Sequence, residues 1–89
     1  MSFGTLIRQL AKSDSPNEIV DAYKVICEWL SRNSAHKESK LNEFVNYLLV
    51  HMSNTSTSVR VASLKACGYL LKSPSIKLSG FYFLFLGTK

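Results

Sequence analysis

Apolar residues recur at the period of an α-helix in four separate stretches of this 89-residue sequence, and short polar breaks separate the stretches. Positions three and four apart share one helix face, so each stretch predicts a helix with one buried stripe. We expect helices over about 3–12, 16–30, 40–52 and 58–72, and therefore an all-α fold. The first three stripes are Phe3, Leu6, Ile7, Leu10 and Ala11; Ile19, Ala22, Tyr23, Ile26, Trp29 and Leu30; and Leu41, Phe44, Val45, Leu48, Leu49 and Met52.

Two of the helix boundaries carry explicit signals. Ser15-Pro16-Asn17-Glu18 matches a capping box, in which the Ser and Glu side chains each satisfy a backbone N–H at the helix start. Ser73-Pro74 is expected to end the fourth helix, because proline disfavours helical backbone in the residue before it.

Composition and length indicate one small folded domain. Hydrophobic residues make up 46% and charged residues 19% of the chain, which is typical of a globular protein. The net charge of +5 permits nucleic acid or an acidic membrane as a partner without demanding either. The N-terminus lacks the features of a signal peptide, and no apolar run reaches the roughly 20 residues of a membrane span. We therefore expect an intracellular protein without a transmembrane segment.

The sequence offers little chemistry for catalysis. Cys27 and Cys67 lie in apolar helical patterns and are expected to be buried free thiols, with a disulfide or a metal site as the alternatives. His36 falls in a charged loop and His51 beside the third stripe, and the six acidic residues are scattered. No Gly-rich phosphate loop is present. We therefore expect that the protein is not an enzyme and that it has no catalytic residue, no metal-binding residue and no cofactor.

The stretch "TSVRVASLKACGYLL" (57–71) and the helix before it resemble a HEAT repeat. Such repeats have an apolar first helix, a turn with Asp or Asn, and a second helix that opens with Val-Arg and continues with small residues. The matching positions are Leu48, Leu49, Met52, Asn54, Val59, Arg60, Ala62, Ala66, Gly68 and Leu71.

The resemblance assigns packing roles to the second helix. Val59 would hold it against the first helix, Ala62 and Ala66 would let two helices approach, and Gly68 would avoid a clash with a following repeat. Arg60 would hydrogen-bond to oxygens of the turn or of a neighbouring repeat.

The implied architecture is an α-solenoid of antiparallel helix pairs, HEAT- or armadillo-like. Residues 1–74 would be the start of a longer array, because two pairs are fewer than a solenoid normally needs. Residues 75–89 form an atypical apolar tail, which we interpret as a truncation product or an alternative transcript end. We expect this tail to destabilise the chain or drive its association, and the C-terminal end to need further repeats or a partner to cover it.

A narrower resemblance rests on Asp21-Ala22-Tyr23, the helix ending in His51, and "ACGYLLKSPSI" (66–76). With these features, residues 5–76 resemble the N-terminus of the telomere-associated Rap-interacting factor family. It implies a nuclear scaffold that acts in telomere maintenance, replication timing or DNA repair and binds DNA. The candidate phosphate or partner contacts are Lys37, Lys40, Arg60, Lys65 and Lys72, and the alternative for each is a solvated helix face.

Two other interpretations stay open. One is a generic HEAT-repeat module that binds proteins, in the nucleus or the cytoplasm. The other is an ENTH/VHS-like adaptor of vesicle traffic, because "AKSDSP" (11–16) resembles the start of that superhelix. Protein partners are expected in each case, and DNA remains a candidate partner.

Overall fold

A computed structural model describes residues 2–35 and 37–71 of the chain. Within these residues it contains four helices and no strand: α1 (Phe3–Lys12), α2 (Pro16–Arg32), α3 (Leu41–His51) and α4 (Thr57–Leu71). The predicted all-α class is confirmed, and each predicted helix is present. The predicted apolar tail (75–89) lies outside the described residues.

The starts of the first two helices are fixed by side chains. Ser2 precedes α1, and its hydroxyl oxygen accepts the backbone N–H of Thr5 at 3.2 Å. The predicted capping box of α2 is confirmed: the Ser15 hydroxyl accepts the Glu18 N–H at 3.3 Å, and Glu18 Oε1 accepts the Ser15 N–H at 3.2 Å. A further backbone N–H, that of Asp14, also donates to Glu18 Oε1, at 3.1 Å. These backbone hydrogen bonds lower the pKa of Glu18.

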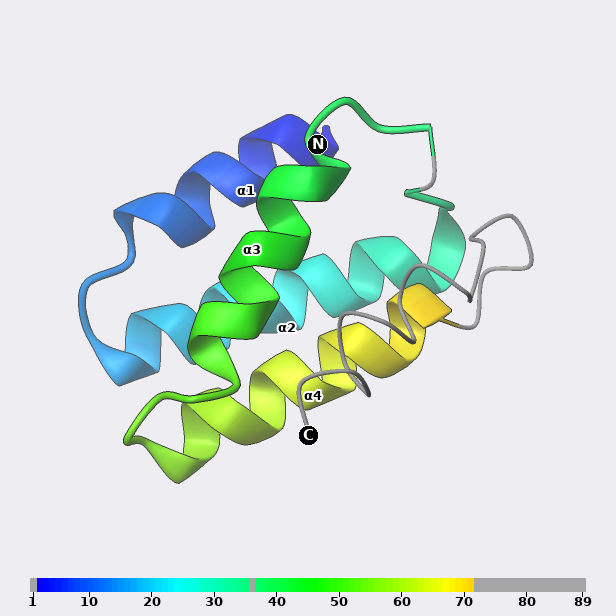
Figure 1. The fold of residues 1–89 in the computed structure, drawn as a ribbon. Coiled ribbons are helices and arrows are strands. Elements are labelled where there is room, and N and C mark those ends of the chain that lie inside the picture. The colour runs from blue at the N-terminus through cyan, green and yellow to red at the C-terminus, as the bar shows by residue number, and fades with distance from the viewer. Residues whose placement is uncertain (1, 36, 72–89) are drawn as a thin grey trace.

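The helices form two pairs, α1 with α2 and α3 with α4, and the two pairs meet through the contact between α2 and α4. Figure 1 shows α1 running antiparallel to α2, α3 crossing in front of α2, and α4 running beside α2 in the same direction. The contact between α2 and α4 is the most extensive, followed by those of α1 with α2 and α3 with α4. Helix α2 therefore takes part in the two most extensive contacts of the fold.

The core lies between the helices and uses most of the predicted stripes. The ring of Phe3 packs edge-on against Phe44 at 5.4 Å between centroids, and at 5.0 Å from Trp29. The fully or nearly fully buried apolar residues are Phe3, Leu6, Ile7, Leu10, Ile19, Tyr23, Ile26, Leu30, Ala35, Phe44, Val45, Leu48, Val59, Ala66, Cys67 and Leu70.

The edges of the stripes differ from the prediction. Ala11 is exposed, because it lies at the margin of the α1 stripe and in the last turn of that helix. Ala22, Trp29, Leu41, Leu49 and Met52 are half-buried. Helix α4 also carries apolar side chains outside its buried stripe, with Val61 43% and Leu64 53% exposed.

Candidate interaction groove

A groove of about 860 Å³ runs between α2 and α4 and opens to solvent. Both helices contribute residues to it at intervals of three or four, so each presents one face to the groove along about three turns. The lining residues are Val20, Tyr23, Lys24, Cys27, Glu28, Ser31, Thr57, Ser58, Val61, Ala62, Lys65 and Tyr69.

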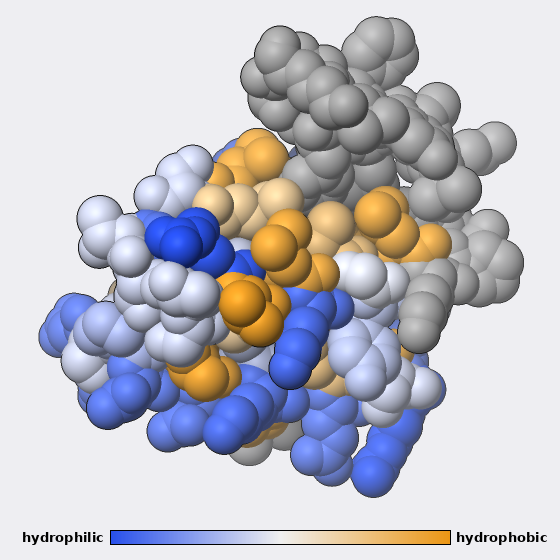
Figure 2. Space-filling view, turned by 90° about the horizontal axis from the view of Figure 1, so that it is seen from below, coloured by the Kyte–Doolittle hydropathy of each residue, from blue (hydrophilic) through white to orange (hydrophobic). Residues whose placement is uncertain are grey.

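Apolar groups occupy the middle of the groove. Val20, Cys27 and Ala62 are half-buried in the groove, and Val61 is 43% exposed. In the view from below, apolar side chains gather near the centre of the face, with hydrophilic side chains to the left of them and below them (Figure 2). The groove therefore offers apolar surface that is accessible to another molecule.

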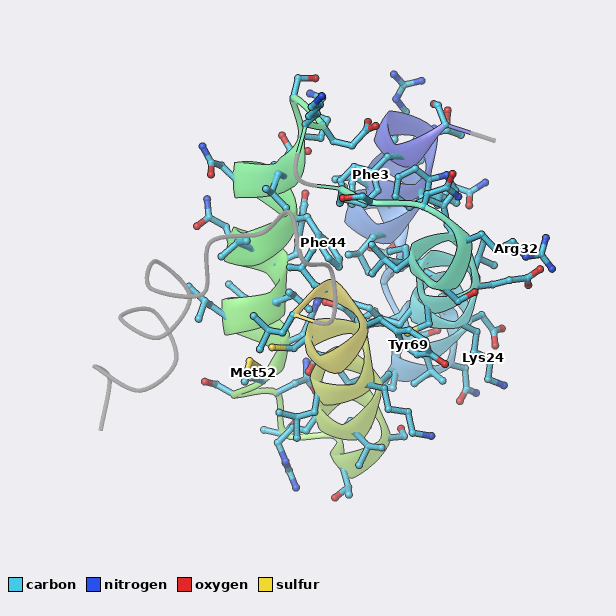
Figure 3. The ribbon with its side chains drawn as sticks, turned by 90° about the vertical axis from the view of Figure 1, so that its right-hand side faces the viewer. Phe3, Lys24, Arg32, Phe44, Met52 and Tyr69 are labelled. Carbon is cyan, nitrogen blue, oxygen red and sulfur yellow. The ribbon has the colours of Figure 1, made fainter. Side chains whose placement is uncertain are left out.

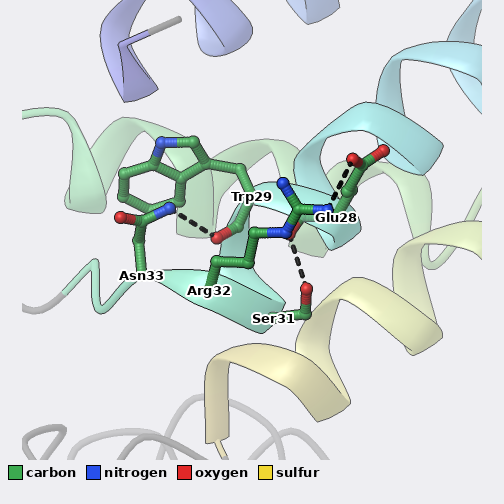
Figure 4. Close-up of polar contacts among 5 residues, drawn as sticks. All are labelled: Glu28, Trp29, Ser31, Arg32 and Asn33. Carbon is green, nitrogen blue, oxygen red and sulfur yellow. Dashed lines mark hydrogen bonds and ion pairs between the residues drawn. The ribbon is translucent and has the colours of Figure 1, made fainter.

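Each wall of the groove carries a lysine. Lys24 projects from α2 and Lys65 from α4, both are exposed, and neither makes an ion pair with any residue in the described part of the chain. Figure 3, which looks along the two helices, shows Lys24 beside α2. The acidic residue of the groove, Glu28, is engaged by Arg32 one turn later at 3.4 Å (Figure 4). The unpaired charge of the groove is therefore positive.

The hydroxyl groups at the ends of the groove are engaged by the helices themselves. The Ser31 hydroxyl donates to the carbonyl oxygen of Glu28 at 2.6 Å (Figure 4), and the Ser58 hydroxyl lies 2.9 Å from that of Ser56. Thr57 Oγ1 accepts a hydrogen bond from Arg60 at 3.0 Å. Each of these hydroxyls therefore already has one partner within its own helix or in the turn before it.

Both cysteines are free thiols, as predicted, but they differ in burial. Cys67 is buried in the core, whereas Cys27 is half-buried and lines the groove. Burial raises the pKa of each thiol, and the nearby Lys65 ammonium opposes part of the increase at Cys27. No group of three His, Cys, Asp or Glu residues suited to a metal ion occurs in residues 2–35 and 37–71.

The turn before α4 is held by Arg60. Its guanidinium donates to the carbonyl oxygens of Asn54 at 2.7 Å and Thr55 at 3.2 Å, and to the Thr57 hydroxyl at 3.0 Å. The side-chain oxygen of Asn54 in turn accepts the Ser56 N–H at 2.8 Å. The expected hydrogen bonds from Arg60 to turn oxygens are confirmed. A residue committed in this way has a structural role, which makes it a poor candidate for a phosphate contact.

Sequence reasoning missed a buried polar pair that joins α2 to α3. The Tyr23 hydroxyl lies 2.6 Å from Nδ1 of His51, which is only 8% exposed. The His51 ring also stacks on Tyr47, with 6.1 Å between centroids. Burial lowers the pKa of His51 and raises that of Tyr23, which favours the neutral form of both groups. The available signal was the position of His51, two turns after Phe44 on the buried side of α3.

The candidate basic contacts do not form one surface. Lys37 and Lys40 belong to the connection between α2 and α3, at the top of Figure 1, and Lys65 to α4 at the bottom. Lys37 is exposed, and Lys40 lies 3.8 Å from Glu43. Lys72 lies outside the described residues. The helices therefore do not gather these lysines into a single track for a phosphate backbone.

The four predicted packing residues of α4 fall into two groups. Val59 and Ala66 are fully buried, as their roles require. Ala62 is half-buried and lines the groove. Gly68 is exposed, and a Cβ added there would meet no atom within 4 Å in the described part of the chain. Its role beside a following repeat stays a prediction.

Comparisons with protein-family models, with curated proteins and with solved structures find no match to this chain. Across residues 2–35 and 37–71, none of the helices has both the length and the apolar character needed to span a bilayer.

Proposed function

We propose that this chain is a non-enzymatic interaction module, built from HEAT-like helix pairs, that binds a protein partner in the groove between α2 and α4. The observation that carries the proposal is the groove itself. Its middle is apolar and solvent-accessible, with Val61 43% exposed, while its walls are the two helices in most extensive contact. A rigid apolar groove is a common way for helical proteins to recognise a partner.

Local features of the second helix pair support the HEAT-like interpretation. Val59 is buried at the start of α4, and Arg60 binds the preceding turn, as that kind of repeat requires. Helices α2 and α4 run side by side in the same direction (Figure 1), which is how the second helices of stacked pairs would lie. A solenoid built from further pairs is therefore our proposal for the longer assembly.

The nuclear, chromosome-associated setting is also a proposal, and it rests on the resemblance of residues 5–76 described above. The separation of Lys37 and Lys40 from Lys65 gives it no added support from phosphate contacts. For this reason we place protein binding ahead of DNA binding and ahead of the vesicle-adaptor alternative.

Selection of peptides from an unbiased display library against the full chain tests the groove. Bound peptides are re-measured against Val61→Asp, which puts a charge into the middle of the groove, and against Val50→Asp, which makes the same change on α3 at a residue 66% exposed. We expect Val61→Asp to weaken binding about ten-fold or more, because it replaces an apolar contact in the groove with a charged group that binding must desolvate, and Val50→Asp to change it less than about two-fold. Circular dichroism verifies that both variants fold. Peptides that bind both variants equally well would overturn the proposal.

A further inference from the structure

The groove presents few hydrogen-bonding groups to the backbone of an incoming chain. Its walls are α-helices, whose backbone groups are paired within each helix except in the first turn of α4 at one end of the groove, and the hydroxyls of Ser31, Thr57 and Ser58 each have a local partner. An extended peptide placed in the groove would leave backbone N–H and C=O groups unpaired, at a cost in free energy for each buried group. A helical peptide satisfies its own backbone and avoids that cost.

The dimensions of the groove also suit a helix. The α2 wall extends from Val20 to Ser31, which corresponds to about 16 Å at the rise of an α-helix. A partner helix of about three turns covers that length and places an apolar stripe of positions three and four apart over the apolar middle. Side chains of the partner at the two margins of this stripe then face the two walls.

The charges on the two walls indicate which charged side chains flank the apolar stripe of the partner helix. Lys24 stands on one wall and Lys65 on the other, and neither is neutralised within the described residues, whereas Glu28 has Arg32 as its partner. Acidic side chains on both margins of an incoming helix would meet these lysines, and basic ones would be repelled.

We propose that the groove between α2 and α4 binds an acidic amphipathic helix of another protein, with Lys24 and Lys65 as the residues that select for its charge. This inference rests on the proposed function, since it names the occupant of the same groove. The apolar middle supplies affinity and the two lysines supply selectivity.

Three synthetic 18-residue peptides test the inference by fluorescence anisotropy with the full chain. The first has Leu on one helical face and Glu on both margins, the second has Lys in place of each Glu, and the third is the first with a central Pro that prevents a continuous helix. Vesicles that contain phosphatidylserine form a fourth arm, because an acidic lipid surface would also attract lysines beside apolar residues. We expect the Glu peptide to bind at least about ten-fold more tightly than the Lys and Pro peptides, and the vesicles not to compete with it.

Charge reversal assigns the selectivity to the groove. The double variant Lys24→Glu/Lys65→Glu should weaken binding of the Glu peptide by about ten-fold and strengthen binding of the Lys peptide, since each reversal replaces an attraction with a repulsion. Lys37→Glu is the matched control, because Lys37 is exposed on a connection outside the groove, and it should change affinity less than about two-fold.

The outcomes separate the inference from the proposed function. Equal binding of the three peptides, an unaltered preference in the double variant, no binding of the Glu peptide, or binding of the vesicles alone would each overturn the acidic-helix inference. If selected peptides still depend on Val61, the groove stands as an interaction site with a different occupant. If they do not, the proposed function fails with it.

Discussion

Replacing Tyr23 with Phe should destabilise the fold out of proportion to the single oxygen that it removes. In the structure, the Tyr23 hydroxyl and Nδ1 of His51 share a hydrogen bond of 2.6 Å, and the histidine is only 8% exposed. Tyr23→Phe would leave that nitrogen buried without its partner. A buried polar group that loses its hydrogen bond costs about 1–3 kcal/mol. For a chain of this size, each kcal/mol lowers the melting temperature by about 4–8 °C.

Tyr47→Phe is the matched control for this experiment. Tyr47 stacks on the same imidazole ring, but it is half-buried and makes no hydrogen bond with another described residue. Its substitution should change the free energy of unfolding by less than about 0.5 kcal/mol. Urea unfolding followed by circular dichroism measures both variants. Equal losses for the two substitutions, or no loss for Tyr23→Phe, would show that the Tyr23–His51 hydrogen bond does not support the fold.

Four further predictions follow from the described contacts and from the sequence. Burial lowers the pKa of His51 below 6.5, so as the pH falls the unfolded chain takes up a proton at this histidine before the folded chain does. The free energy of unfolding should therefore fall as the pH drops through about 6.5, and urea titrations of His51→Gln should lack this dependence on pH. Arg60→Ala removes three hydrogen bonds to the turn and should cost about 1–3 kcal/mol in the same assay, and Arg60→Lys should recover only part of it. Mass spectrometry after brief alkylation should find Cys27 modified before Cys67, since only the first is partly exposed; the reverse order would contradict the described burial. Deleting residues 75–89 should raise stability or abolish self-association in sedimentation experiments, and a monodisperse parent chain unchanged by the deletion would refute the expectation for the tail.

The helices could be predicted from the sequence because their signals are local. Periodic apolar residues and the capping box at Ser15 and Glu18 depend only on neighbours along the chain. The resemblance to a HEAT repeat also predicted the role of Arg60, whose acceptors belong to the turn just before it.

The groove and the buried polar pair could not be predicted in the same way. Tyr23 and His51 are 28 positions apart, and their contact depends on how α3 crosses α2. The groove likewise requires α2 and α4 to lie side by side. The apolar residues of α4 indicated the groove only in part. Val61 and Leu64 lie outside the buried stripe of that helix, and their exposure can be interpreted only once the neighbours of the helix are known.

The placement of the single tryptophan determines what intrinsic fluorescence can report about folding. Trp29 is near the end of α2, contacts Phe3 of α1 and does not line the groove. Its emission should therefore follow the docking of the N-terminal helix, while far-UV circular dichroism averages over all helices. Refolding traces that differ between the two signals would mean that the first pair forms on its own timescale. An emission change caused by a ligand would then mean that binding at one face of α2 alters packing at the other.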